Sequence, residues 1–340
     1  MSDPILATRE RAGFIERVHR GRVAIVDGRS RDGALVAALG DVGAAFLPRS
    51  SCKILQALPM VESGAADAAR LSPRRLAFSC ASHQGSDAHA ALAAEWLAEM
   101  GLGEADLLCG AQAPGDQETR ERMIRAGEAP SQLHNNCSGK HSGFLCLARH
   151  LGAPLNDYVS PGHAVQKAVA AATAELADEA LSGYAIDGCS APNFAVSLTG
   201  LARAMARIAA AETALKGARR EAAIRLRSAM AEHPFEVAGE GRACTDLMRA
   251  GGGRLVVKTG AEGAFIAILP ERGLGVALKI DDGNTAAAES AMTGILVALG
   301  ALDAADPRVA ARLTPREVNR RGLICGGGAP TEAIMRITLS

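Results

Sequence analysis

Aromatic side chains are scarce in this 340-residue sequence, and neither sign of charge is in excess. Phe, Trp and Tyr make up 3% of the residues, and 37 Lys plus Arg balance 37 Asp plus Glu. A nucleic-acid-binding protein needs a positive surface and, for single strands, rings on which bases stack. The composition therefore argues against a nucleic-acid partner.

Long hydrophobic runs are also missing. No apolar stretch approaches the roughly 20 residues that cross a bilayer. The first residues, MSDPILATRERAGF, mix both charge signs and lack the apolar core of a signal peptide. We therefore expect a cytoplasmic protein without a membrane partner. Its eight cysteines are then expected to be reduced thiols, most of them small core residues.

The remaining composition, 48% hydrophobic and 22% charged, is typical of a folded globular protein. Apolar runs predict strands near both ends of the chain: a hairpin over 16–39 with a turn at Asp32-Gly33, three short strands over 254–282, and a last strand near 323–328. Helical patterns lie between them, at about 86–100, 116–126, 138–151, 163–177, 196–213 and 217–232, and another follows at about 285–299.

Pairing the strands from the two ends is the simplest way to bury all of them. This predicts an α+β fold, with an antiparallel sheet formed by the N- and C-terminal strands, covered by helices, and an inserted helical lobe. We expect a single domain over 1–340, with a sheet lobe at about 1–85 and 235–340 and a helical lobe at about 86–234. The sequence shows no linker or internal repeat that would favour a tandem array.

One short motif suggests nucleophilic catalysis. Ser50 and Lys53 are three residues apart at an expected helix start, so their side chains share one face. Lys258-Thr259-Gly260 follows 208 residues after Ser50 on a predicted strand, and Ser-x-x-K with Lys-Thr-Gly is the pairing of penicillin-recognising hydrolases. A lysine can activate a serine only when it is neutral near pH 7, and burial or a second cation lowers its pKa. We therefore expect Lys53 to deprotonate Ser50, with Lys258 as the second cation that keeps Lys53 neutral. The alternative is that Ser50 is only a helix cap.

Small polar residues gather in four further stretches: FSCASHQGSDAH (78–89), where Ser82 follows Cys80 at an expected strand end; HNNCSGKHSG (134–143), which opens a helix; DGCSAPNFA (187–195); and VAGEGRACTDLM (237–248). Such clusters are more typical of site loops than of a core. No His-x-x-x-His pair or Gly-rich phosphate loop is present.

These blocks carry a resemblance. CASH, NNCSGKH, DGCSAP, HP followed by VAGEGR, and KIDDGN are similar, in order and from about residue 13 to 330, to the rhizobial-type or third-class L-asparaginases. That family resembles serine β-lactamases and glutaminases in fold. The resemblance implies hydrolysis of L-asparagine to L-aspartate and ammonia by a serine–lysine mechanism through an acyl-enzyme, and we expect a homodimer.

The resemblance also implies roles for single residues. The two Ser-Lys dyads are Ser50 with Lys53 and Ser82 with Lys258. The expected substrate-binding residues are Arg49, Asn136, His141, Asp187 and Gly260. The expected zinc ligands are Cys137, Lys140 and Cys189.

Lys-Thr-Gly brings this chain closer to the β-lactamase pattern and leaves substrate contacts open. Two other functions therefore stay in view: a β-lactamase-like or glutaminase serine hydrolase, and a metal- or amino-acid-binding protein without turnover.

Overall fold

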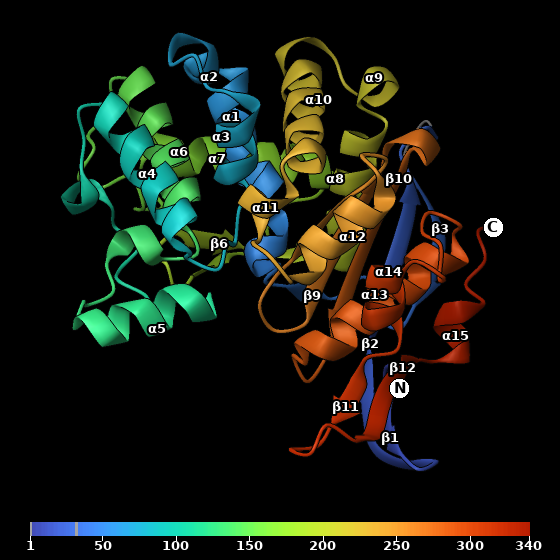
Figure 1. Cartoon of the computed structure of the whole chain (residues 1–340). Helices are drawn as coiled ribbons and strands as arrows, with labels where there is room; N and C mark the ends of the chain where they lie inside the picture. Colours follow the sequence, from blue (N-terminus) through green and yellow to red (C-terminus); the bar gives the residue numbers. More distant parts are fainter. Residues whose placement is uncertain (1, 31–32) are drawn as a thin grey trace.

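The computed structural model describes residues 2–30 and 33–340. Within them, an eight-stranded antiparallel sheet forms the centre (Figure 1), in the order β11-β12-β1-β2-β10-β9-β8 with β3 paired to β2. Its strands are β1 (Ile5–Arg11), β2 (Phe14–Asp27), β3 (Ala34–Leu39), β8 (Val256–Thr259), β9 (Ala264–Leu269), β10 (Leu274–Ile280), β11 (Arg316–Val318) and β12 (Ile324–Pro330). Strands from both ends of the chain share one sheet, so the predicted α+β class is confirmed.

The structure confirms the hairpin predicted over 16–39 and the three strands predicted over 254–282. β2 pairs with β3 through Val23 and Leu39, and β10 lies between β2 and β9. Asp32, in the predicted hairpin turn, lies outside the described residues. Val23 to Val26 are all fully buried because helices lie on both faces of the sheet. A Cβ on Gly275 of β10 would collide with the backbone of the helix at Ala206, which is why that position is a glycine.

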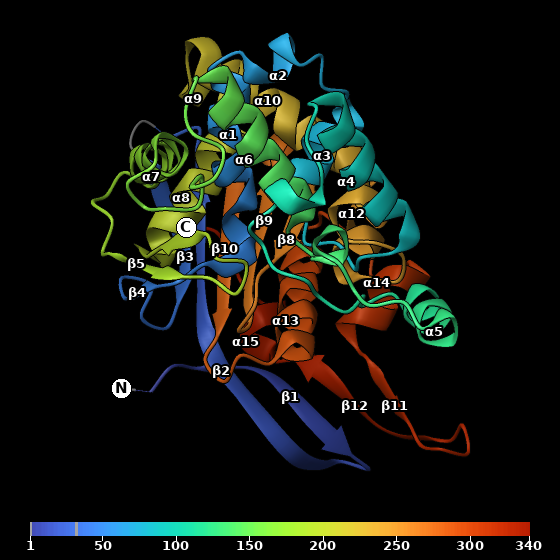
Figure 2. The same ribbon diagram turned by 90° about the vertical axis from the view of Figure 1, so that its left-hand side faces the viewer.

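Most helices also lie where the sequence predicts them. They are α4 (Asp87–Glu99), α5 (Gln117–Ala126), α6 (Ser138–His150), α7 (Ala164–Ala177), α10 (Gly217–Glu232) and α13 (Thr285–Ala298). The helix predicted at 196–213 is divided into α8 (Leu198–Ala209) and α9 (Ala211–Ala214). α8 contacts β2, β9 and β10, whereas α13 covers the opposite side of the sheet (Figure 2).

The strand end expected around Cys80 and Ser82 is wrong. Residues Pro73–Ser79 form helix α3 instead, and Cys80 to Ser86 are a loop. The start of α3 follows from its sequence, because the Ser72 hydroxyl accepts the Arg75 N–H and Pro73 occupies the first helical position.

The sequence also left several elements unpredicted: β1, α12 (Ala243–Gly251), α14 (Pro307–Leu313), and the short β4 (Ala45–Phe46), β5 (Tyr184–Ile186), β6 (Pro192–Phe194), β7 (Val196–Ser197), α2 (Ala65–Ala68), α11 (Pro234–Val237) and α15 (Glu332–Met335). Among residues 2–30 and 33–340, every helix falls short of the length and apolar character that a membrane span requires.

Candidate active site

The RSSCK segment lies beside the sheet. Residues Arg49–Cys52 form the 3₁₀ turn η1, and helix α1 (Lys53–Glu62) begins three residues later than Ser50. Arg49 has φ +51°, a left-handed conformation that costs energy for a residue with a side chain. Asn193 of β6 holds it there: its Oδ1 accepts the Arg49 N–H at 3.0 Å, and its Nδ2 donates to the Arg49 carbonyl at 3.3 Å.

Lys53 is 1% exposed and connects three of the predicted blocks. Its ammonium donates to the Ala81 carbonyl, directly before Ser82, and lies 3.0 Å from Cys137 Sγ and 3.5 Å from the Asn136 carbonyl. Among the described residues no hydrogen bond joins Ser50 to Lys53. The Ser50 side chain is half-buried.

Lys258 lies in the middle of β8 and is fully buried. Burial lowers its pKa to about 7; Cys244 opposes this shift, and the charge of Lys53 adds to it. The ammonium donates to the Thr259 carbonyl at 2.7 Å. A Cβ on Gly260 would lie 2.7 Å from the Pro48 carbonyl and 3.0 Å from the Ser51 N–H. Because strand residues two apart point to one side, Lys258 projects toward η1 as well.

Ser82 lies in the loop after α3. Its N–H donates to the Val237 carbonyl at 2.9 Å, while its hydroxyl is buried without a hydrogen-bond partner among the described residues. A buried polar group in this state costs free energy, and such groups gather at functional sites. Next to it, a Cβ on Gly239 would lie 2.5 Å from the Gln84 side chain, so this glycine lets the two loops meet.

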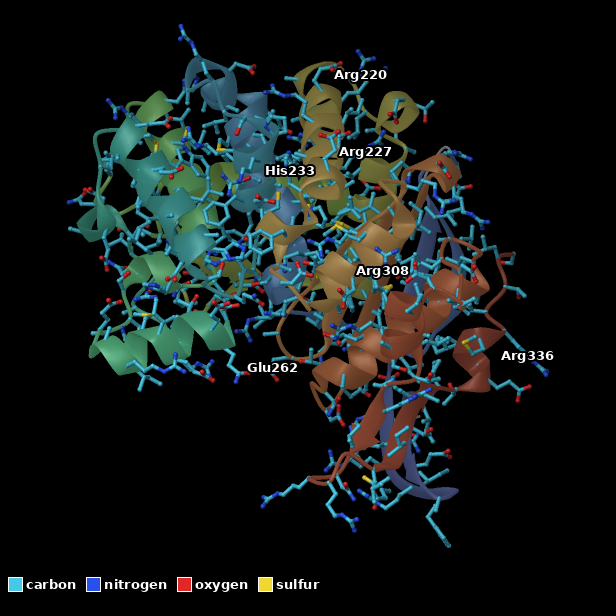
Figure 3. All side chains as sticks on the ribbon, in the orientation of Figure 1. Arg220, Arg227, His233, Glu262, Arg308 and Arg336 are labelled. Carbon is cyan, nitrogen blue, oxygen red and sulfur yellow. The ribbon has the colours of Figure 1, made fainter. Side chains whose placement is uncertain are left out.

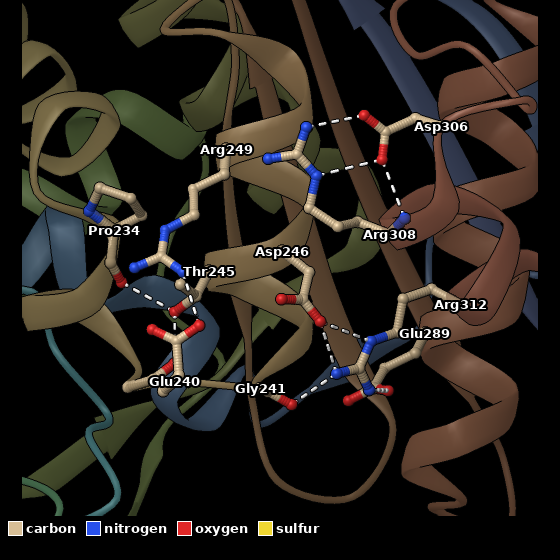
Figure 4. Close-up of polar contacts among 11 residues, drawn as sticks. Pro234, Glu240, Gly241, Thr245, Asp246, Arg249, Glu289, Asp306, Arg308 and Arg312 are labelled. Atoms are coloured by element: carbon tan, nitrogen blue, oxygen red, sulfur yellow. Dashed lines mark hydrogen bonds and ion pairs between the residues drawn. The ribbon is translucent and has the colours of Figure 1, made fainter.

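The loop over 237–242 is fixed by ion pairs (Figure 4). Arg312 of α14 donates to the Gly241 carbonyl at 2.5 Å and pairs with Asp246 at 2.7 Å and Glu289 at 3.0 Å. Burial raises the pKa of Glu289. Glu240 pairs with Arg249 of α12 at 2.6 Å. These contacts hold the segment that receives the Ser82 N–H.

Two thiols and an amine meet at the start of α6. Lys140 Nζ lies 3.0 Å from Cys189 Sγ. The two thiols shift each other's pKa in opposite directions: Cys137 lowers the pKa of Cys189, and Cys189 raises that of Cys137, so the pair favours one thiolate and one thiol. Burial lowers the pKa of Lys140, but Cys189 and Cys137 raise it by more, so the net shift is upward.

Sulfur donors suit zinc, so Cys137 and Cys189 fit the expected ion. Among the described residues no group of three His, Cys, Asp or Glu could hold a metal. A zinc site here would therefore depend on Lys140 as third protein ligand, which must lose a proton to bind.

Arg49 and Asp187 already contact each other. Two guanidinium nitrogens of Arg49 lie 3.1 and 2.8 Å from Asp187 Oδ1, and this hydrogen bonding raises the pKa of Arg49. Glu262, in the turn between β8 and β9 (Figure 3), adds negative potential at Arg49. Arg49 could bind an anionic group of a ligand, and Asp187 and Glu262 could bind a cationic one.

His141 is fully buried, which lowers its pKa to about 4. Its Nδ1 lies 2.8 Å from the hydroxyl of Tyr158, which also accepts the Leu108 N–H at 2.8 Å. The Tyr158 hydroxyl thus connects the His141 ring to the backbone at Leu108. The remaining predicted residue, Asn136, accepts a hydrogen bond from Cys137 Sγ at 3.0 Å.

The structure thus groups the predicted residues by contact: Arg49 with Asp187, Lys53 with Asn136 and Cys137, Lys140 with Cys189, and Gly260 with the turn that holds Ser50. Asn193 and Tyr158 were missed. Asn193 directly follows the DGCSAP block, which was a usable signal; Tyr158 stands in no motif.

The sequence model of the family described as L-asparaginase II matches residues 7–328. No curated protein matches the chain. Several solved structures share distant similarity in shape.

A crystal structure of Mglu is 13% identical with a TM-score of 0.43, and the match covers 78% of this chain and 58% of the Mglu chain. A putative beta-lactamase from Bacteroides dorei is 13% identical with a TM-score of 0.40, covering 76% of this chain and 84% of that one. A beta-lactamase from Mycobacterium bovis is 11% identical with a TM-score of 0.39, covering 79% and 89%.

Proposed function

Because the chain belongs to the L-asparaginase II family, and is therefore an amidohydrolase, we propose that it hydrolyses L-asparagine to L-aspartate and ammonia. The observation that carries the serine–lysine mechanism is Lys258, a fully buried lysine with a pKa of about 7. About half of such a group is neutral at pH 7, so it can accept a proton from a hydroxyl.

In the proposed mechanism Ser50 attacks the side-chain amide carbon. Its proton passes to a neutral lysine and then to the departing nitrogen, so the C–N bond breaks as ammonia leaves and an acyl-enzyme forms. Water then attacks the ester carbon, gives a proton to the same lysine, and releases aspartate as Ser50 regains its proton.

Sequence reasoning placed the base at Lys53 and used Lys258 to keep Lys53 neutral. The low pKa of Lys258 favours Lys258 as the group that holds the proton, with the Ser82 hydroxyl as relay. Lys53, which points at two carbonyl oxygens and a thiol, would position the Ser82 loop and lower the pKa of Lys258.

The zwitterionic substrate needs paired contacts. Arg49 would bind the α-carboxylate, and Asp187 with Glu262 nearby would favour the α-ammonium. Cys137, Lys140 and Cys189 would hold zinc, which when bound would orient the substrate or the start of α6 and is not required for the serine–lysine chemistry. The unpaired cysteines agree with the expected cytoplasmic location, which stays a prediction.

Ammonia release from purified protein, with Asn and Gln compared side by side, tests the proposal. Nitrocefin hydrolysis without ammonia release would favour a β-lactamase-like hydrolase. A rise in melting temperature with Asn but no ammonia would favour the binding protein. Zinc is tested separately by metal content per chain, which should fall in Cys189→Ser.

A further inference from the structure

Two buried histidines lie beside Ser82, and the proposed mechanism gives neither of them a role. His83 follows Ser82 directly, and His89 lies in the first turn of α4; each is 1% exposed. Their rings stack with centroids 4.7 Å apart and planes 10° apart. Phe78, in α3, stacks on His83 at 5.0 Å, and Phe235, in α11, stacks on His89 at 4.6 Å. We call these four side chains the ring cluster.

Hydrogen bonds fix the orientation of the His83 ring. The Gly85 N–H donates to Nδ1 at 3.1 Å, so this nitrogen carries no proton. Nε2 therefore carries the proton of the neutral ring and donates to the Ser138 hydroxyl at 3.0 Å. Burial holds the pKa of His83 well below its usual range, and a charge on His89 would lower it further, so the ring is neutral near pH 7. His83 thereby joins the Ser82 loop to the first residue of α6.

His89 makes a second connection. Its Nε2 donates to the Phe235 carbonyl at 3.0 Å, and its Nδ1 lies 2.6 Å from the Ser86 hydroxyl. Burial lowers the pKa of His89 as well. Phe235 belongs to the same short helix as Val237, whose carbonyl accepts the Ser82 N–H at 2.9 Å. His89 therefore holds the segment that receives the Ser82 N–H.

Three consecutive residues of the loop are thus held by three different elements: the Ala81 carbonyl by α1, the Ser82 N–H by α11, and the His83 ring by α6. The Ser82 hydroxyl has no such support, because it is buried without a hydrogen-bond partner among the described residues. Its position therefore depends on the backbone of the loop and on what holds that backbone in place.

We propose that His83 and His89 are positioning residues, which place the Ser82 hydroxyl for proton transfer to Lys258 through the ring cluster and its hydrogen bonds. This inference rests on the proposed function, in which Ser82 is the proton relay. Proton transfer requires heavy atoms about 2.6–3.2 Å apart, so a shift of about 1 Å at Ser82 would interrupt the relay. The proposed contacts to the α-carboxylate and α-ammonium of the substrate come from other elements. Loss of either histidine should therefore lower kcat far more than it raises KM.

The test compares His83→Phe with a matched control. His83→Phe keeps an aromatic ring in the cluster but removes both hydrogen bonds. His163 is also buried, and it makes the same pair of bonds away from Ser82: its Nδ1 accepts the Val165 N–H at 3.2 Å, and its Nε2 donates to the Pro154 carbonyl at 3.0 Å. His83→Phe and His163→Phe should lose melting temperature to a similar extent.

Only the variants in the ring cluster should lose turnover. His83→Phe and His89→Phe should lower kcat by roughly 10²-fold and keep KM within about three-fold, whereas His163→Phe should stay within about three-fold in both. His83→Asn is the conservative variant, because its side-chain oxygen can still accept the Gly85 N–H. It should restore part of the turnover, to roughly ten-fold below wild type.

Amide hydrogen exchange at Ser82 tests the placement without a substrate. Exchange of this N–H should become about ten-fold or more faster in His83→Phe and His89→Phe, and should stay as in wild type in His163→Phe. If wild type releases no ammonia, the proposed function fails, while the exchange result still decides this inference. Turnover in His83→Phe equal to that in His163→Phe, or an unchanged Ser82 amide, would overturn it.

Discussion

Ser50 and Ser82 differ from ordinary serines in their surroundings. Ser50 follows the strained residue Arg49, and the Ser82 hydroxyl is buried without a hydrogen-bond partner among the described residues. Ser51, between Ser50 and the helix, shows the contrast: it is fully buried, and its hydroxyl donates to the Pro48 carbonyl at 2.6 Å. A serine satisfied in this way stabilises the turn but has no free hydroxyl to offer a substrate.

Ser50→Ala should reduce ammonia release by roughly 10³-fold or more, because it removes the nucleophile and little packing. Ser51→Ala is the matched control and should cost about 1 kcal/mol of stability while activity stays within a few-fold. Initial rates and melting curves of both variants check this. Retained activity in Ser50→Ala together with an inactive Ser82→Ala would transfer the nucleophile role to Ser82.

The pKa of Lys258 predicts the acidic side of the pH–rate profile. Activity should fall as the pH drops through about 7, because protonation removes the base. Removing the charge of Lys53 should move this limb to higher pH in the residual activity of Lys53→Met, since one cation that lowers the Lys258 pKa is gone. Values of kcat/KM from pH 5 to 9 measure both, and an unchanged limb in Lys53→Met would contradict the coupling.

The low pKa of Lys258 should also make the stability of the protein depend on pH, and it fixes the direction of that dependence. The pKa of Lys258 is about 7 in the folded protein against an ordinary value of 10.5, so between these pH values the unfolded chain binds the extra proton. Stability therefore rises with pH across this window. Lys258→Met should be more stable than wild type at pH 7, by up to roughly 5 kcal/mol, with a difference that shrinks toward pH 10. Urea unfolding at both pH values checks this.

At the scale of elements, the candidate site depends on the close contact between the end of β8 and the turn η1. Gly260→Ala should separate them, because its Cβ would meet the Pro48 carbonyl and the Ser51 N–H. We expect a loss of about 1–3 kcal/mol in stability and a fall of up to ~10²-fold in turnover. Gly103→Ala, where a Cβ has nothing within 4 Å, is the control and should behave like wild type.

Elements proved easier to predict from the sequence than contacts. The pattern of hydrophobic residues in the sequence predicted β8 to β10 and most helices, with ends within two residues of those in the structure. Helix α3 was missed because the CASH block was interpreted as a strand end, although Ser72-Pro73 carried a helix-start signal. The contact between Arg49 and Asn193 spans 144 residues along the chain, and no local pattern encodes such a pairing. The same holds for Lys53, whose ammonium lies against Cys137 and not Ser50.

The expected division into a sheet lobe and a helical lobe raises the question of whether they unfold separately. Several contacts join the two expected lobes. α8, from the middle of the chain, covers β2 and β10, and α10 contacts α1 and α3. Lys53 also ties the start of α1 to the start of α6. Parts that share a core in this way lose their packing together.

We therefore predict a single cooperative unfolding transition. Trp96, the sole tryptophan, is 1% exposed in α4 and reports on the helical segment by its fluorescence. Amide hydrogen exchange in β9 and β10 reports on the sheet. Both should give the same free energy of unfolding in urea, because the shared core allows no stable half. Repeating both measurements at several protein concentrations removes any contribution from self-association. A Trp96 transition at clearly lower urea than the loss of exchange protection in β10 would show that the helical segment unfolds by itself.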